Sequence, residues 1–358
     1  MRGNCAAAAT LRSDGDGIRP VRPADAKRRE VTTTGRRRFS EQRLDHEVTE
    51  TVDEVPRTQT PTLAFIGAGR AGSALATGLA AAGHNVVAIH SRTPAHAARL
   101  AAATGASMVA SAVEAVRCAD ITFATVPDGE ILRVAASIAG AGVAPPGHSL
   151  VHCSATYGSD VLAAARSTTA AVGVFHPLQA LAGPPSAALL RGTSFVIEAP
   201  EPLLTLLTAL VADLGGYVID VPARGRALYH AAAVLVGNAP PALLARATSL
   251  LEEAGVGHAD AHRALAALLI GAASNAAAAG AAPALTGPVV RGDAATVARH
   301  LDVLAADPNT RELYRRLALE ALALAGPEGR EAVADTLAAA APPGGRAAAK
   351  VVAPPRVA

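Results

Sequence analysis

Glycines at a fixed spacing directly follow a short apolar run, which is the first predicted strand. Leu63 to Ile66 predict a buried strand, which leads into a G-x-G-x-x-G pattern that opens a predicted helix. In that context the glycines permit a tight turn, a close approach of backbone N–H groups to a ligand, and close helix packing, and the helix N-terminus attracts an anion. The pattern predicts a dinucleotide pyrophosphate site at Gly67, Ala68, Gly69, Arg70, Ala71 and Gly72.

The end of the second predicted strand indicates which dinucleotide would bind. Residues 85–90 lead into Ser91-Arg92-Thr93, where no Asp or Glu is present to accept from a ribose 2′-OH. Arg92 can instead pair with a 2′-phosphate in bidentate geometry, helped by the hydroxyls of Ser91 and Thr93. The sequence therefore favours NADP(H), and the alternative is that Arg92 is an ordinary solvated loop residue.

Two further strand ends predict ligand contacts at the same sheet edge. Val126 and Pro127 follow the strand that begins at Ile121, and we expect them to line the nicotinamide ribose. Ser154 follows the strand over residues 149–153 and could bind substrate or ribose, whereas His152 and Cys153 are interpreted as strand interior.

Three polar side chains are candidates for the chemistry. His176 is held extended by the following proline and could give a proton to a carbonyl that receives hydride, or it could be a structural histidine. His230 and Asn238 share a broad face of an otherwise apolar predicted helix. Because polar groups on such a helix need partners, we assign both residues to the site, with Asn238 orienting a carbonyl.

A later loop supplies candidates for substrate binding. Thr286 lies in this loop, and Arg291 could bind a substrate carboxylate or pair with a nearby acidic residue, while Asp293 is predicted to cap the next helix. His258 and His262 have i, i+4 spacing but no Glu between them and no nearby third ligand, so the sequence predicts no metal.

The order of predicted elements defines the fold class. Strands alternate with Ala-rich helices over residues 61–222, which predicts an α/β domain with a Rossmann-type, doubly wound, mostly parallel sheet. Residues 223–341 show only helical patterns and predict an all-helical domain for substrate binding and dimerisation. Residues 264–290 carry no charge and are interpreted as a fully buried helix followed by a loop. Residues 1–58 are expected to be a disordered extension, and 342–358 a flexible tail.

Composition excludes several classes of partner and of chemistry. The chain has 358 residues and a net charge of +2, so neither nucleic acid nor a membrane is an expected partner. The three cysteines have no metal or disulfide spacing, and no signal peptide is recognisable, which together favour the cytoplasm. Lysine occurs only at Lys27 and Lys350, so a lysine acid or base within the predicted folded region is excluded.

Taken together, these motifs resemble a known family. The resemblance is carried by the Gly67 to Gly72 fingerprint, Ser91-Arg92-Thr93, Thr125-Val126-Pro127-Asp128, His152-Cys153-Ser154-Ala155, Phe175-His176-Pro177-Leu178-Gln179, Tyr229-His230-Ala231-Ala232 with Asn238, and Leu285-Thr286-Gly287-Pro288 with Arg291-Gly292-Asp293. Over residues 60–340 the chain is similar to bacterial proteins that join a Rossmann-like domain to the domain of unknown function 2520.

The resemblance implies an activity but no substrate. It implies an NADP-dependent oxidoreductase in the broad group of 6-phosphogluconate dehydrogenase, pyrroline-5-carboxylate reductase and prephenate dehydrogenase, with the helical domain forming a homodimer. The pair His176-Pro177 is similar to the His-Pro of prephenate dehydrogenases, which implies a catalytic role for His176. Val234 stands where β-hydroxyacid dehydrogenases and ketopantoate reductases have a lysine, four residues before the asparagine.

The leading hypothesis is an NADPH-dependent reductase of a small carbonyl or imine that carries a carboxylate, with a ketopantoate-like 2-keto acid as the first expectation. His176 or His230 would supply the proton, and Arg291 or Arg226 would neutralise the carboxylate. Two alternatives remain open: hydride exchange between NADP and another redox cofactor such as a deazaflavin, and a non-catalytic NADP-binding sensor or assembly protein.

Overall fold

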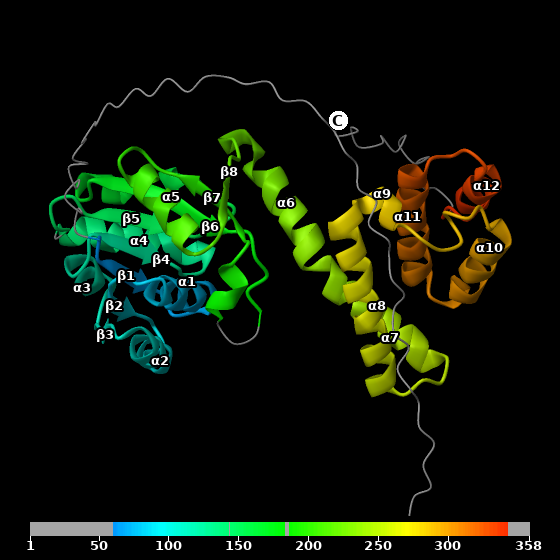
Figure 1. Ribbon diagram of the computed structural model, residues 1–358, viewed down its shortest axis with the longest axis horizontal. Coiled ribbons are helices and arrows are strands. Elements are labelled where there is room, and N and C mark those ends of the chain that lie inside the picture. The colour runs from blue at the N-terminus through cyan, green and yellow to red at the C-terminus, as the bar shows by residue number, and fades with distance from the viewer. Residues whose placement is uncertain (1–59, 143, 183–185, 343–358) are drawn as a thin grey trace, which may run out of the picture. The chain divides into compact units, whose positions relative to one another are not determined.

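The computed structural model describes residues 60–142, 144–182 and 186–342 (Figure 1). The predicted N-terminal extension over residues 1–58 and all but the first residue of the predicted tail over residues 342–358 lie outside these ranges.

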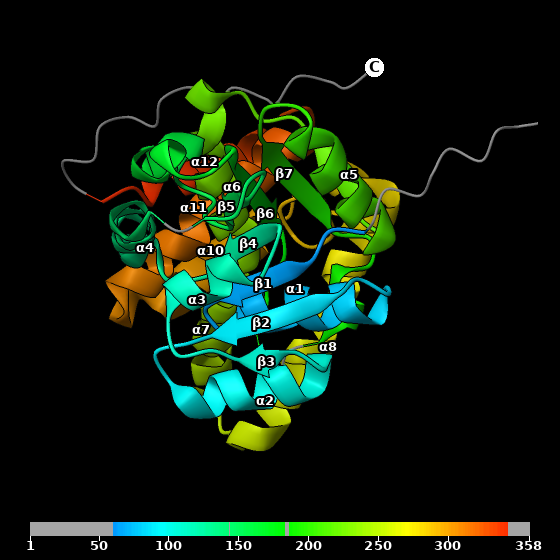
Figure 2. The same cartoon turned by 90° about the vertical axis from the view of Figure 1, so that its left-hand side faces the viewer.

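One eight-stranded sheet organises the first part of the described chain. Its strand order is β3-β2-β1-β4-β5-β6-β7-β8, and every pair is parallel except β6 with β7 (Figure 2). The predicted Rossmann-type, mostly parallel sheet is therefore confirmed, although the two-residue exposed strand β3 was not predicted. The strands are β1 (Leu63–Ile66), β2 (Val86–His90), β3 (Ser107–Met108), β4 (Ile121–Ala124), β5 (Ser149–His152), β6 (Ala171–Pro177), β7 (Ser194–Glu198) and β8 (Tyr217–Ile219).

Helices pack on both faces of this sheet. One face is covered by α1 (Arg70–Ala81), α2 (Pro94–Thr104), α5 (Leu203–Asp213) and the short η2 (Ala187–Leu190). The other is covered by α3 (Ala112–Arg117), α4 (Asp128–Ala141) and η1 (Ser159–Ser167). Apolar strands buried on both faces are what a parallel sheet requires, because crossover helices occupy each side.

Aromatic packing within the sheet core is concentrated in one row. Four of the five phenylalanines in the chain stand side by side across β1, β4, β6 and β7, and all four are fully buried. Successive ring centroids are 5.0, 5.5 and 5.0 Å apart, within the range favourable for aromatic pairs. The row Phe65, Phe123, Phe175 and Phe195 therefore ties β1, β4 and β6, which end at the candidate site, to one another and to the antiparallel β7.

Strand β1 marks the point where the strand order reverses. Ile66, at its carboxyl end, is in register with His90 of β2 on one side and with Ala124 of β4 on the other. The loops that follow these three strands therefore meet at one edge of the sheet. A ligand of an open α/β sheet binds in the crevice outside such strand ends.

Only helices follow β8 within the described residues. They are η3 (Ala223–Gly225), α6 (Arg226–Gly237), α7 (Ala239–Glu253), α8 (His258–Ala279), α9 (Ala281–Ala284), α10 (Ala294–Val303), η4 (Leu304–Ala306), α11 (Pro308–Ala325) and α12 (Glu331–Ala339). The all-helical character predicted for this region is confirmed, whereas a domain boundary at residue 222 stays a prediction. The single helix predicted over residues 226–253 is broken at Asn238, because Pro240 and Pro241 lack N–H donors and disfavour helix just before them.

The interpretation of residues 264–290 as a fully buried helix is wrong. In α8 only Ala261 is buried, and Leu268 and Ile270 are each 67% exposed. A run of residues without charges shows only that the segment is apolar. Such a segment can form an exposed helix face as well as part of the core. The buried cluster of the helical region lies instead on α10, α11 and α12, around Val297, Leu301, Val333 and Leu337.

By length and composition, one helical stretch, Ala223–Glu253, could cross a membrane, which alone is weak evidence for a span. It has a mean hydropathy of 1.3 in its most apolar window, none of which is buried. The stretch includes the break at Asn238 that separates α6 from α7.

Candidate functional site

The Gly67–Gly72 loop is built by contacts that only glycine permits. Gly67 has a φ of +111°, and a Cβ there would lie 2.5 Å from the Thr125 carbonyl oxygen. A Cβ on Gly72 would lie 2.2 Å from the Gly67 carbonyl oxygen, so α1 packs directly against the loop. Gly69, in contrast, faces open space. The first and third glycines therefore bring chain segments together, and the second leaves room for a ligand, as the sequence predicts.

Thr125 fastens this loop to the neighbouring strand end. Its Oγ1 donates a 2.6 Å hydrogen bond to the Gly67 carbonyl oxygen, across 58 residues of sequence. The sequence gives the Thr125 hydroxyl no role. No sequence signal distinguishes this threonine from others, because its partner is a backbone atom distant along the chain.

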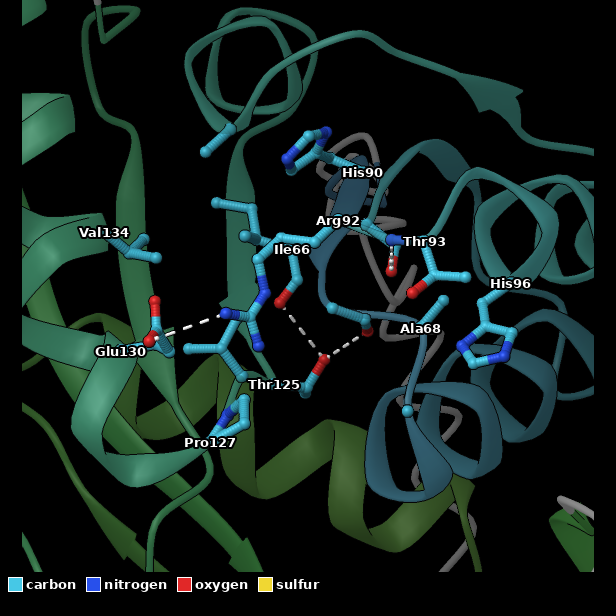
Figure 3. A pocket seen from close by; sticks show the side chains of 15 residues that line it. Ile66, Ala68, His90, Arg92, Thr93, His96, Thr125, Pro127, Glu130 and Val134 are labelled. Carbon is cyan, nitrogen blue, oxygen red and sulfur yellow. Dashed lines mark hydrogen bonds and ion pairs between the residues drawn. The ribbon is translucent and has the colours of Figure 1, made fainter.

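A cavity of about 270 Å³ opens beside the loop, and it gathers most of the predicted cofactor residues (Figure 3). Predicted residues at the cavity wall are Gly67, Ala68, Gly69, Ser91, Arg92, Thr93, Val126 and Pro127. Residues that the sequence analysis did not single out complete the wall: Ile66, His90, His96, Ala112, Thr125, Glu130 and Val134. The mixture of an open glycine loop, an arginine and apolar side chains suits a nucleotide.

Arg92 extends across this cavity toward helix α4. Its Nη1 lies 3.5 Å from Glu130 Oε1, as the dashed line in Figure 3 shows. Glu130 also accepts from Arg133 Nη2 at 2.8 Å, so this carboxylate keeps one cationic partner when Arg92 turns away. The Arg92 side chain is 69% exposed, and its pairing with Glu130 is therefore weak enough for an anionic ligand to displace it.

A second cavity adjoins the first along helices α1 and α2. It has a volume of about 420 Å³ and shares Ala68, Gly69 and His96 with the first cavity. Arg70, predicted as a cofactor residue, lies here together with Arg99. Neither α1 nor α2 has an acidic residue in its first turn, so both helix N-termini keep their attraction for an anion.

His176 stands at the end of β6 and contacts helix α6. Its Nδ1 lies 2.8 Å from the Tyr229 hydroxyl, with the two rings nearly perpendicular at 88°. Burial lowers the pKa of His176 to about 4, and the nearby His230 adds to this effect. The imidazole is therefore neutral at neutral pH, which makes it a hydrogen-bond donor or a base rather than a resting imidazolium acid.

His152 and Ser154 hold the loop after β5. His152 is fully buried, its Nε2 is 3.0 Å from the Gly158 carbonyl oxygen, and its Nδ1 accepts from the Ser154 N–H. Ser154 Oγ accepts from the N–H groups of Thr156 and Tyr157, and the residue is 5% exposed. Because its hydroxyl is engaged within the loop, we leave Ser154 out of the substrate contacts proposed below.

Cys153 also belongs to the interior, because burial raises the pKa of its thiol. This environment does not favour the thiolate form, so the structure gives Cys153 no nucleophilic character.

Arg226 is a buried partner of Glu198 rather than a free carboxylate ligand. The residue is 6% exposed, its Nη2 pairs with Glu198 Oε2, and its Nη1 donates to the Tyr157 carbonyl oxygen at 3.3 Å. Ser159 donates to the other Glu198 oxygen through both its N–H and its hydroxyl. The expectation that Arg226 neutralises a substrate carboxylate therefore does not hold, because its charge is already paired.

The remaining predicted site residues are exposed. His230 lies on α6 close enough to influence His176 electrostatically, and Asn238 lies at the α6–α7 break. Thr286 and Arg291 belong to the segment between α9 and α10. Within the described ranges no hydrogen bond or ion pair joins Asn238, Thr286 or Arg291 to the cavity walls, so their site roles stay predictions. Asp293 caps α10 by accepting from the Thr296 N–H, which confirms its predicted role.

His258 and His262 are exposed side chains of α8. His258 Nδ1 lies 2.9 Å from Glu252 Oε1, and the two imidazoles stack with centroids 6.3 Å apart. In the part of the chain that the structure describes, no group of three or more His, Cys, Asp or Glu side chains is placed to hold a metal ion.

The sheet order, the glycine loop at the reversal of strand order and the adjoining cavity define a dinucleotide-binding domain of the Rossmann type. Sequence models agree with this class. Residues 62–177 match the family described as NADP oxidoreductase, coenzyme F420-dependent, and residues 193–321 match the domain of unknown function DUF2520. The predicted resemblance is therefore confirmed. No curated protein sequence matches the chain significantly.

Solved structures share the fold. A protein from Bacteroides fragilis, provisionally assigned as an NADP oxidoreductase, is 24% identical with a TM-score of 0.60, over 73% of this chain and 97% of its own. A protein from Thermotoga maritima is 23% identical with a TM-score of 0.58, over 74% and 99%. A provisionally assigned oxidoreductase from Mycobacterium avium is 20% identical with a TM-score of 0.52, over 74% and 98%.

The lowered histidine pKa values predict that mild acid destabilises the fold. Burial lowers the pKa of His148, His152 and His176 in the folded state, to about 4 for His176. In the unfolded chain these histidines have the ordinary pKa of ~6.5, so below that pH the unfolded chain binds more protons than the folded chain. The free energy of unfolding is therefore lost as the pH falls from about 6.5 toward 4. From pH 7 to pH 5 we expect a loss on the order of 1 kcal/mol in urea unfolding.

Replacing one of these histidines assigns that loss. His176→Asn should flatten the dependence, because one of the three buried imidazoles is removed. A stability that stays constant or rises between pH 7 and pH 5 would contradict the burial of these rings in their neutral form.

Proposed function

We propose that the protein is an NADPH-dependent reductase of a small carbonyl or imine compound. The observation that carries this proposal is the strand end at the cavity, where Ser91, Arg92 and Thr93 stand in place of an acidic residue. The family described as an NADP oxidoreductase, whose model matches residues 62–177, supports it. The pyrophosphate would be held by the open backbone at Gly69 and the N-terminus of α1, and the 2′-phosphate by Arg92 with Ser91 and Thr93.

The adjoining basic groups strengthen the preference for a 2′-phosphate. His96 lines both cavities, and Arg70 and Arg99 line the second. A 2′-phosphate adds nearly two negative charges at this position, which a cluster of cations favours and which a 2′-OH lacks. We therefore propose NADP(H) rather than NAD(H) as the cofactor.

The bound cofactor would supply the hydride, and the protein would supply the hydrogen bond at the acceptor atom. His176 is the best placed of the predicted catalytic residues, because it lies at the carboxyl end of β6 and its side chain is neutral at neutral pH. A neutral imidazole N–H can bind a carbonyl oxygen or an imine nitrogen and stabilise the charge that develops there. His230 is a second proton carrier beside it, and Asn238 is proposed to orient the carbonyl.

The substrate class follows from the available charges. We propose a small carboxylate-bearing compound, with a ketopantoate-like 2-keto acid as the first compound to try and a cyclic imine acid as the second. Arg291 is the remaining candidate for the carboxylate, because Arg226 is paired with Glu198. No lysine is present in the described residues, so a covalent imine with a lysine side chain takes no part in the mechanism.

The name of the matched family favours one alternative activity. It includes coenzyme F420, a deazaflavin, so hydride exchange between NADP and a deazaflavin is the second candidate. This reaction needs the same dinucleotide site but replaces the small substrate with a second planar cofactor. Adding an oxidised deazaflavin to the substrate panel distinguishes the two activities directly.

Replacing Arg92 should reveal the cofactor preference. In a fluorescence titration we expect NADPH to bind more tightly than NADH, and Arg92→Ala to weaken NADPH by about 10- to 100-fold, since a charge-assisted hydrogen bond contributes ~1.5–3 kcal/mol. NADH affinity should change little. Arg133→Ala is the matched control, because Arg133 binds the same Glu130 but does not line the cavity. Tighter binding of NADH by the unmodified protein would refute the role given to Arg92.

Replacing His176 should separate catalysis from cofactor binding. NADPH oxidation is followed against keto acids, cyclic imines and a deazaflavin, and His176→Ala should lower kcat by roughly 100-fold or more while NADPH affinity is retained. His300→Ala serves as the control, because His300 lies in the helical region and contacts Tyr314 as His176 contacts Tyr229. Binding of NADPH without turnover of any acceptor would instead favour a non-catalytic sensor or assembly protein.

We also propose that a second copy of the chain covers the outer faces of α6 and α8. Large apolar side chains on these helices are exposed, although α7 and α8 pack on each other. A soluble monomer rarely leaves such a patch uncovered, and Ala-rich helices can approach another helix closely. The residues concerned are Leu228, Val234, Leu235, Val236, Leu268 and Ile270.

Light scattering after gel filtration tests this homodimer. The protein should elute with twice its chain mass, and Leu235→Glu combined with Ile270→Glu should shift it to the monomer. Leu132→Glu, at an equally exposed leucine on α4, should have no effect. A monomeric unmodified protein, or one that stays in solution only with detergent, would contradict the proposal.

A further inference from the structure

Tyr229 contacts the ring that the proposed mechanism uses, although the sequence gave it no role of its own. Its hydroxyl lies 2.8 Å from His176 Nδ1, and the ring centroids are 5.7 Å apart. Tyr229 follows Arg226 by three residues on α6, so the buried Arg226–Glu198 pair holds the turn that presents the tyrosine. Strand β6 therefore holds His176 in place, and the start of α6, fixed by Arg226, holds Tyr229.

The direction of this hydrogen bond follows from what each atom can do. A neutral imidazole has one N–H and one acceptor nitrogen, and a phenol has one proton to donate. Among the described residues the Tyr229 hydroxyl has no other hydrogen-bond partner. If Nδ1 carried the ring proton, the phenol proton would have no acceptor among the described residues. Donation from Tyr229 to Nδ1 satisfies both groups and leaves the ring proton on Nε2.

The opposite edge of the ring is accessible. Within the described ranges the fully buried side-chain atoms that lack a partner belong to His84, Thr122, His148 and Arg226, and His176 Nε2 is not among them. Since Nε2 also has no protein partner there, it retains access to solvent and to a ligand. One nitrogen of His176 is thus bound by Tyr229, and the other has no partner among the described residues.

Charged and titratable groups from three elements surround this ring. They are Asp128 on α4, His152 on β5, and Arg226 and His230 on α6, with Tyr229 in direct contact. Burial lowers the pKa of the ring most, and His230, Arg226 and His152 add to this effect against the opposing charge of Asp128, so the ring is uncharged at neutral pH. Only an uncharged imidazole has two tautomers, so only then does the partner at Nδ1 decide which nitrogen carries the proton.

We propose that Tyr229 is a positioning residue, which donates to Nδ1 of His176 and thereby holds the proton on Nε2, facing the ligand. The N–H at Nε2 is then available to a carbonyl oxygen or an imine nitrogen. The identity of that acceptor rests on the proposed function, whereas the tautomer itself does not. Tyr229 need not touch the substrate for this role.

The chain contains a matched control pair. His300 on α10 and Tyr314 on α11 repeat the arrangement, with Nδ1 and the hydroxyl 2.9 Å apart, ring centroids 5.6 Å apart and an interplanar angle of 86°. This pair belongs to the helical region, where Tyr314 packs against the buried cluster of α10, α11 and α12. The pair His300 and Tyr314 therefore shows the NMR signals of a His–Tyr contact to which no role in the site is proposed.

The test reads the histidine nitrogens by long-range ¹H–¹⁵N correlation NMR of the full-length protein without cofactor, with His176→Gln and His300→Gln assigning the signals. At pH 7.5 the unmodified protein should show His176 with a bare Nδ1 and a protonated Nε2. In Tyr229→Phe the nitrogen shifts should move toward a mixture of tautomers. The pKa of His176 should also rise, because a donor to the neutral ring is lost.

Tyr314→Phe should change the His300 signals and leave those of His176 unchanged. A proton on Nδ1 of His176 in the unmodified protein would overturn the proposal, and that spectrum decides the point even if Tyr229→Phe fails to fold. Unchanged His176 shifts in a folded Tyr229→Phe variant, recognised by unaltered His300 signals, would overturn it as well.

Turnover provides a separate readout. With any acceptor that the unmodified protein reduces, Tyr229→Phe should lower kcat by about 10-fold, the loss expected for one misdirected hydrogen bond, and leave NADPH affinity unchanged. Should no acceptor be reduced, the proposed function fails while the tautomer measurement still stands, so the two failures are distinguishable.

Discussion

An ion pair with a buried arginine fixes the start of helix α6 against the sheet. Arg226 is almost completely enclosed, and its charge is balanced by the partly exposed Glu198, which Ser159 holds from its other oxygen. Removing Glu198 would leave the Arg226 charge buried without compensation, which is costly. Since Tyr229 lies one turn further along α6, the same pair determines where the tyrosine meets His176. Three segments distant in sequence therefore depend on one interaction: the loop after β5, the end of β7, and α6.

The cofactor side of the site depends on a different constraint, which is the absence of side chains. Gly67 and Gly72 allow β1, α1 and the end of β4 to approach so closely that a methyl group at either glycine would collide with backbone. Thr125 then closes the gap with a short hydrogen bond. The resulting loop is rigid where it contacts protein and open at Gly69, where a phosphate group would lie. The glycine loop thus offers an anion a fixed backbone site, whereas the exposed side chain of Arg92 offers one that can adapt.

Local signals in the sequence predicted the fold and the cofactor loop well. Strand β1 was predicted with its observed limits, because its apolar run ends at the glycine turn. Tyr229, Thr125 and Glu130 were missed, since their partners lie far along the chain and no spacing rule connects them. The exposure of α8 was also missed. Hydropathy indicates that a surface is apolar, but it does not show whether that surface is buried within the same chain or against another molecule.

The lack of lysine throughout the described residues has a chemical consequence of its own. Aldehydes, ketones and imines exchange readily with lysine amines, and a hydride donor would convert the resulting adducts into permanent secondary amines. A reductase that handles such compounds is exposed to this form of self-inactivation. Arginine supplies the positive charges of the described residues without a nucleophilic amine, because its guanidinium stays protonated. Under the proposed function, the described residues would therefore offer a reactive carbonyl compound no lysine amine to modify.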